Sequence, residues 1–176
     1  MRKLKVTEMG RMNIEEFKAS EKIPLIVVLD DVRSMYNVGS IFRTSDAFRT
    51  ESIWLCGITA RPPHPEIHKT ALGAEGSMEW RYFATTHEAI EALKRAGYII
   101  YSIEQCEGST MLQNIQIKKT QKYAIILGNE VKGVKQEIVD MCDGCIEIPQ
   151  FGTKHSLNVA STAGIVIWEF AKQMIV

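Results

Sequence analysis

The chain has 176 residues, of which 45% are hydrophobic and 24% are charged, a balance typical of one globular domain. Its 21 basic residues match its 21 acidic residues, so the net charge is zero. This balance excludes a histone-like or tail-driven nucleic-acid binder, whose affinity comes from bulk attraction to phosphate, but it permits a local basic site. Neutrality also removes one obstacle to self-association, which is compatible with a dimer.

The sequence carries no signal for a membrane, a secretory route or a metal. No apolar run approaches the roughly 20 residues of a membrane span, and we expect a cytoplasmic protein without membrane contact. Four cysteines are too few for a disulfide scaffold. Cys142 and Cys145 have metal-like spacing but lack a second pair of ligands, so we expect buried, unbridged thiols. The prolines around His64 and His68 favour an irregular loop over metal ligation.

The first half of the chain alternates strands and helices. The β-branched run Leu25–Leu29 predicts a strand buried on both faces. Asn37 is a candidate helix cap, because apolar residues follow it at helical spacing. Ser52–Cys56 predicts a second strand. The proline-rich stretch from Thr59 to Ser77 predicts a long functional loop with a short helix around Glu66–Leu72.

The second half repeats this alternation. Thr85 and Glu88 form a capping box, and Gly97 follows where the helix should end. The further elements predicted are strands at Tyr98–Ile103, Tyr123–Leu127 and Cys145–Ile148 and helices at Lys135–Met141 and Leu157–Met174.

This alternation predicts an α/β fold, a mainly parallel sheet with helices on both faces. Ligands of such sheets bind beyond the carboxyl ends of strands. The segments after Leu29, Leu127 and Ile148 are therefore the places to look for a site.

The first of these segments contains Asn37 and, six residues later, Arg43. Gly39 between them permits close backbone approach. An arginine near a helix start opposes the helix macrodipole. Phosphate binding would justify it, whereas the alternative is an ordinary solvated arginine.

The second and third segments each allow a structural and a functional interpretation. Gly128 to Gly133 follows neither the dinucleotide fingerprint nor a Walker A loop, and a tight strand-to-helix turn has the same pattern. After Ile148, a polar loop opens a helix, and Ser156 or Asn158 either caps that helix or orients a substrate.

Together and in this order, the three segments resemble the SpoU (TrmH) branch of the SPOUT class of RNA methyltransferases. The resemblance covers roughly residues 24–172. The matching motifs are an asparagine followed six residues later by arginine at Asn37 and Arg43, a G-x-E box at Gly128–Glu130 with a further glycine at Gly133, and an I-P-x-x-G stretch at Ile148–Gly152 leading into Ser156-Leu-Asn158.

The resemblance implies a C-terminal trefoil knot, a homodimer and the cofactor S-adenosylmethionine held in the knot. General rules of chain topology disfavour a knot, so only the resemblance predicts one. It also implies that the cofactor cradle consists of Leu127, Gly128, Asn129, Ile148, Gln150 and Leu157.

The reaction implied by the resemblance is methyl transfer to a ribose 2′-hydroxyl of tRNA or rRNA. Arg43 resembles the residue that assists the hydroxyl, and we expect it to bind an RNA phosphate and the emerging alkoxide, since arginine is a poor base. Glu130 is expected to hold Arg43 or its neighbours. Asn37, Ser156 and Asn158 would orient the ribose or the arginine, and Arg43 would serve a site shared between two subunits.

A non-catalytic, knotted RNA-binding module is the alternative function. Gln150 departs from the methionine of many relatives and puts one cofactor contact in doubt. We expect residues 1–23 to be a short extension, with a helix near Met9–Lys18 whose basic neighbours contact RNA or only solvent, and residues 24–176 to be the methyltransferase domain.

Overall fold

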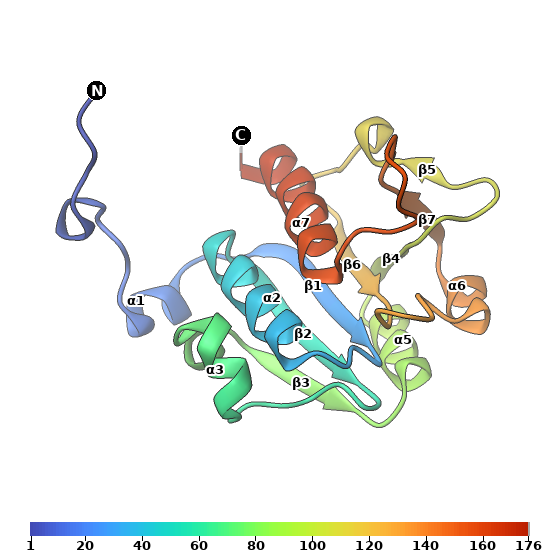
Figure 1. The fold of residues 1–176 in the computed structure, drawn as a ribbon, viewed down its shortest axis with the longest axis horizontal. Coiled ribbons are helices and arrows are strands. Elements are labelled where there is room, and N and C mark those ends of the chain that lie inside the picture. The colour runs from blue at the N-terminus through green and yellow to red at the C-terminus, as the bar shows by residue number, and fades with distance from the viewer. Residues whose placement is uncertain (176) are drawn as a thin grey trace.

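The protein is an α/β fold built on one parallel sheet (Figure 1). The structure, a computed structural model, describes residues 1–175, and Val176 lies outside the described residues. The seven strands have the order β3-β2-β1-β6-β4-β7-β5, and every neighbouring pair is parallel. Their bounds are β1 Ile23–Asp30, β2 Thr50–Cys56, β3 Trp80–Phe83, β4 Tyr98–Ile103, β5 Thr110–Met111, β6 Lys122–Leu127 and β7 Gly144–Glu147.

Helices cover both faces of the sheet, as the sequence predicts (Figure 1). Buried side chains of α1, α2, α3 and α7 pack on one face, and those of α5 and α6 pack on the other. The bounds are η1 Val6–Glu8, α1 Ile14–Ala19, α2 Met35–Ala47, α3 Pro65–Ala71, α4 Ala74–Ser77, α5 Thr86–Arg95, η2 Leu112–Asn114, α6 Gln136–Met141 and α7 Val159–Ile175.

Strand β1 shows why its sequence is a continuous apolar run. Leu25, Val27 and Leu29 belong to the core beneath α2 and α7. Ile26 and Val28 belong to the second core, beneath α5 and α6. Successive side chains of a strand point to opposite faces, so a strand covered on both faces needs apolar residues at every position. The prediction of a doubly buried strand is confirmed.

The start of α2 differs from the prediction. The helix begins at Met35, and its N-cap is Ser34, whose hydroxyl accepts a hydrogen bond from the Asn37 amide at 3.3 Å. The prediction that Asn37 caps this helix is therefore wrong. Ser34 already accepts the hydrogen bond of the Asn37 backbone amide. The Asn37 side chain, in the first turn of the helix, is therefore available for other contacts.

Helix α7 begins at Val159, two residues later than predicted, and its cap is Asn158. The Asn158 side-chain oxygen accepts hydrogen bonds from the amides of Ala160 at 2.9 Å and Ser161 at 3.3 Å. Of the two cap candidates, Asn158 and Ser156, the structure selects Asn158. Strand β3 has no counterpart in the prediction, because this short edge strand has no fully buried residue and therefore no apolar run.

The cysteines and histidines have structural roles that differ in part from expectation. Cys142 and Cys145 are free thiols, as expected, but they are only half-buried, so the expectation of full burial is wrong for the pair. Cys56 is a buried free thiol. His64 caps α3 by accepting a hydrogen bond from the Glu66 amide, and His68 lies inside α3. The short helix predicted around Glu66–Leu72 is therefore confirmed, and the irregular loop expected around the two histidines is wrong. Within residues 1–175, no three histidine, cysteine or acidic side chains gather as a metal site would require.

The first helix is shorter than predicted. It begins at Ile14, where Asn13 and Glu16 form a capping box, and the residues from Met9 to Asn13 are not helical. Phe17 of α1 is buried and packs into the main core. No helix among residues 1–175 has the length and apolar character to cross a membrane.

Candidate cofactor and substrate site

A cleft of about 620 Å³ lies beyond the carboxyl ends of β4 and β6, beside the segment that joins β7 to α7. This is the edge at which parallel sheets bind ligands. Eight residues singled out from the sequence line it together with Glu130: Leu127, Gly128, Asn129, Ile148, Gln150, Ser156, Leu157 and Asn158. The fold thus brings the second and third motif segments together around one cleft, which we call the main cleft.

The loop after β6 forms one wall of the main cleft and is closed on itself. The Asn129 amide donates to the Gly133 carbonyl at 3.1 Å, and the Gly133 amide donates to the Asn129 carbonyl at 2.8 Å. A side chain at Gly128 would lie 2.2 Å from the Gly133 backbone, which is too close for any residue but glycine. The G-x-E box is therefore a tight loop whose shape depends on glycine.

The end of β4 forms a second wall that the sequence prediction missed. Glu104 accepts hydrogen bonds from the amides of Val134 at 3.1 Å and Gln105 at 2.9 Å. The Gln105 side chain donates to the carbonyl of His155 at 2.6 Å. These bonds tie the loop after β6 and the segment between β7 and α7 to the end of β4. Ligands of parallel sheets bind beyond the ends of strands, and β4 ends at Ile103. Applied to this strand as well, the same rule would have indicated this wall from the sequence.

The first motif segment reaches the main cleft through a chain of hydrogen bonds. The Asn158 side-chain amide donates to the Asn37 oxygen at 3.1 Å, and the Asn37 amide donates to Glu130 at 2.9 Å. The Glu130 carboxylate also accepts the backbone amides of Arg33 and Ser34, both at 2.9 Å. One residue from each motif therefore joins this chain, which we call the Asn158–Asn37–Glu130 network.

These contacts fix the ionisation of Glu130. Partial burial raises its pKa, but the donors from Arg33, Ser34 and Asn37 outweigh burial, so its pKa lies below the ordinary value of 4.5. The carboxylate is therefore charged at neutral pH. A negative charge beside the start of α2 also interacts favourably with the helix macrodipole.

Arg43 lies outside the main cleft. Its side chain is exposed on α2, and within residues 1–175 its guanidinium has no hydrogen bond or ion pair. The expectation from the sequence is that Glu130 holds Arg43 or its neighbours. The structure shows the second alternative, because Glu130 accepts hydrogen bonds at the start of the same helix and makes none with Arg43. Arg43 lies six residues after Asn37, about one and two-thirds turns farther along α2. The contacts that Glu130 makes at the start of the helix therefore do not extend to Arg43.

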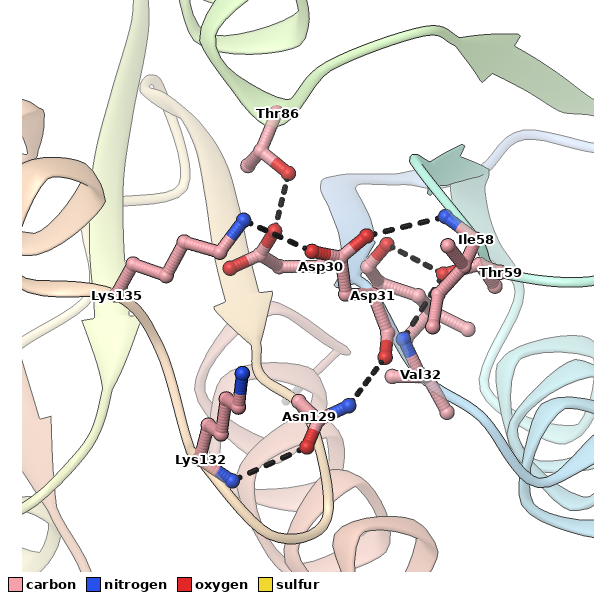
Figure 2. A network of polar contacts seen from close by, with 10 residues as sticks. Asp30, Asp31, Val32, Ile58, Thr59, Thr86, Asn129, Lys132 and Lys135 are labelled. Atoms are coloured by element: carbon pink, nitrogen blue, oxygen red, sulfur yellow. Dashed lines mark hydrogen bonds and ion pairs between the residues drawn. The ribbon is translucent and has the colours of Figure 1, made fainter.

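A second set of contacts joins the loops after β1, β2 and β6 (Figure 2). The Asp31 carbonyl accepts the Asn129 side-chain amide at 2.8 Å. The Asp31 carboxylate accepts the Ile58 amide at 3.0 Å and pairs with Lys135 at 3.0 Å. Partial burial opposes ionisation of Asp31, but the two donors prevail and its pKa is lowered. Asp31 therefore fixes three strand-end loops relative to one another.

The chain matches a known family and its members. The family model described as SpoU rRNA Methylase matches residues 24–168. A tRNA (guanosine(18)-2'-O)-methyltransferase of Thermus thermophilus is 29% identical over 167 residues, which are 95% of this chain and 84% of that protein. An uncharacterized tRNA/rRNA methyltransferase of Borreliella burgdorferi is 31% identical over 163 residues, 92% of this chain and 69% of the relative.

The fold agrees with solved structures. An AdoMet-bound rRNA methyltransferase from Sinorhizobium meliloti has a TM-score of 0.80 and 28% identity to this chain. The similarity covers 89% of this chain and 59% of that protein, so this chain spans about three fifths of the solved relative. Since the family model matches most of the sequence, the resemblance seen in the three motifs is confirmed, and the chain belongs to the SpoU rRNA methylase family.

Proposed function

We propose that the protein transfers a methyl group from S-adenosylmethionine to a ribose 2′-hydroxyl of tRNA or rRNA. The observation that carries this proposal is the meeting of all three family motifs at one place. Segments separated by more than a hundred residues in the sequence join in the Asn158–Asn37–Glu130 network beside the main cleft. The match to a family of RNA methylases supplies the reaction class.

The main cleft suits the proposed cofactor. Leu127, Ile148 and Leu157 offer apolar surface for an adenine ring, and the loops beside them offer backbone groups. Two carboxylates line the cleft, but Glu104 and Glu130 are both occupied by backbone amides. When bound, S-adenosylmethionine supplies an electrophilic methyl group. Gln150 also lines the main cleft. A side chain is therefore present at this position of the cleft wall, where many relatives have methionine.

The polar residues have separate roles in this proposal. Asn37, Ser156 and Asn158 orient the ribose, since positioning a weak nucleophile is a large part of catalysis. Arg43 binds an RNA phosphate and stabilises the alkoxide that emerges from the 2′-hydroxyl. The guanidinium suits this role because it has fixed hydrogen-bond donors and a permanent positive charge.

A homodimer would bring Arg43 to the main cleft of the partner subunit. Two observations support this arrangement. Arg43 is exposed and outside its own chain's main cleft. Helix α7 beside α2 exposes an apolar stripe, with Ile165 at 42% and Trp168 at 52% exposure, and the Trp168 ring lies 5.5 Å from Phe48 of α2. Exposed apolar stripes of this kind are typical of subunit contacts.

The finer features of the family complete the proposal. The segment between β7 and α7 passes through a trefoil knot, and the bond from Gln105 to the His155 carbonyl supports a close passage there. Residues 24–176 form the methyltransferase domain, and residues 1–23 form an extension whose α1 anchors it through Phe17. We also propose that the enzyme acts in the cytoplasm.

Mixed dimers test the shared site. We would combine an Arg43→Ala chain with a chain whose main cleft is blocked by Leu157→Glu, each with its own affinity tag. Leu157 is 41% exposed, so this change is tolerated by the fold. Each parent homodimer should be inactive on labelled total tRNA and rRNA. The mixed dimer should regain about half of wild-type activity, because one of its two equivalent sites is intact.

The outcomes separate the parts of the proposal. Calorimetry should show that wild type and Arg43→Ala bind S-adenosylmethionine and that Leu157→Glu does not. A mixed dimer with no activity would place Arg43 at its own chain's cleft. A folded wild type that binds RNA but no cofactor would overturn the enzyme and leave the knotted RNA-binding module.

A further inference from the structure

A second cleft, of about 360 Å³, lies beside the main cleft, and nothing in the proposed reaction uses it. We infer that it binds one nucleotide of the substrate RNA, adjacent to the nucleotide that is methylated. This inference rests on the proposed function and adds an RNA subsite to it. Its lining consists of Asp30, Asp31, Arg33, Ile58, Asn129, Val131, Lys132, Gly133 and Lys135.

The position of the second cleft suits a neighbouring nucleotide. Both clefts are lined by Asn129, Val131, Lys132 and Gly133, so they share the loop after β6 as a common wall. The shape of this loop is fixed by the two backbone bonds between Asn129 and Gly133 and by the bond from Asn129 to the Asp31 carbonyl. An RNA strand whose ribose reaches the main cleft can therefore cross a rigid wall into the second cleft.

The charges of the second cleft favour an anion. Figure 2 shows Lys132 and Lys135 extending from the same chain segment near the end of β1. Lys135 is paired with Asp31, and within residues 1–175 the side chains of Arg33 and Lys132 have no hydrogen bond or ion pair. Two cationic groups thus remain to hold a phosphate.

The carboxylates of the second cleft do not cancel this charge. Asp31 already accepts the Ile58 amide and the Lys135 ammonium. Asp30 is only 2% exposed, accepts a hydrogen bond from the Thr86 hydroxyl, and has its pKa raised by burial. Asp30 lines the cleft, but its carboxylate is held by Thr86 and burial favours its neutral form, while pairing with Lys135 neutralises Asp31.

The apolar walls provide a surface for a base. Ile58 is 67% exposed and Val131 is 77% exposed, and both line the second cleft. Exposed apolar side chains beside free cations match the two parts of a nucleotide, the apolar face of a base and a phosphate. The volume also agrees, since ligand pockets begin at about 300 Å³.

RNA binding at varied salt tests this inference. We would measure the dissociation constants of total tRNA and purified rRNA for wild type, the double variant Arg33→Ala with Lys132→Ala, and Ile58→Ala. The double variant should weaken binding roughly tenfold and lower the salt slope by about 0.7 for each phosphate that is no longer neutralised. Ile58→Ala should weaken binding with an unchanged slope, because it removes only the surface for the base.

Matched controls keep the result specific. Lys94→Ala removes one exposed positive charge on α5, near the opposite end of that helix from Thr86, and should leave RNA binding unchanged. Cofactor affinity should be unchanged in Ile58→Ala and Lys94→Ala, and the backbone amides of Arg33 and Lys132 remain in place in the double variant. If the wild type methylates RNA and the double variant binds it like Lys94→Ala, the subsite is wrong. A wild type that neither binds nor methylates RNA would instead refute the proposed function.

Discussion

The start and the middle of α2 differ in how far their polar groups are satisfied. At the start, Asn37 accepts from Asn158 and donates to Glu130, which also holds the backbone of Arg33 and Ser34. In the middle, Arg43 is exposed and has no partner within the described chain. Groups that already have partners shape the site, whereas a free cation remains for substrate. In the proposed reaction, the same helix would carry positioning residues at its start and a substrate-binding residue in its middle.

Replacing Glu130 by Gln should have the largest effect on stability at the start of α2. The carboxylate has two accepting oxygens, but an amide has one, so its NH₂ would face the Arg33 amide. Losing a charged hydrogen bond of this kind should lower the free energy of unfolding by about 1.5–3 kcal/mol. Urea unfolding would measure this change.

The matched control for Glu130→Gln is Arg43→Ala. Its exposed side chain has no partner in residues 1–175, so the free energy of unfolding should stay within about 0.5 kcal/mol of wild type. Methyl transfer by this variant should nevertheless fall by roughly 100-fold or more, as expected for loss of transition-state stabilisation. Equal destabilisation by both changes would contradict the comparison between the two parts of α2.

Two substitutions of Asn158 separate its two roles. Asn158→Ala removes the cap of α7 and the bond to Asn37, and should lower the free energy of unfolding by about 1 kcal/mol. Asn158→Asp keeps an accepting oxygen for the cap but cannot donate to Asn37. Thermal unfolding should show that the aspartate retains most of the stability at neutral pH.

Kinetics should then give a different ranking of the same two variants. Both lose the bond that orients Asn37, so both should have a reduced kcat with little change in cofactor affinity. A fully active Asn158→Asp enzyme would show that the Asn158–Asn37–Glu130 network holds the fold and does not orient the substrate.

The pH dependence of stability should show the smallest effect. The folded-state pKa of Glu130 is lowered from 4.5 by its donors, so its stabilising contribution is present above pH 4.5 and is lost as pH falls through the lower folded value. The pKa of Asp31 is also lowered, from 3.8, so its stabilising contribution is likewise lost as pH falls below that value. Asp30 acts with the opposite sign, because burial raises its pKa above 3.8.

Acid unfolding of wild type and Glu130→Gln would isolate the contribution of Glu130. The two stability curves should converge as pH falls from 4.5 through the lower folded-state pKa of Glu130, since the wild-type carboxylate is then neutral in both the folded and the unfolded state. Parallel curves through this range would show that the ionised form of Glu130 contributes no stability.

Much of the fold could be predicted because its signals are local. The apolar run of β1, the spacing in α5 and the glycine after it depend on neighbouring residues, and the structure has these elements where expected. Strand β3 escaped prediction because an edge strand needs only half-buried side chains. The helix start at Ser34 was missed because Asn37 is an equally good cap by residue type, and only the contacts made by its side chain exclude it.

The sequence by itself determined the motif residues and the sheet edge on which they lie, because parallel strands place the loops after β1 and β6 together and the motifs identify the family. Only the tertiary structure decided which side chains meet. Glu130 reaches the start of α2 and leaves Arg43 free, and Glu104 closes the main cleft from β4. These contacts join residues far apart in sequence, so they depend on strand order and loop geometry, which local spacing does not encode.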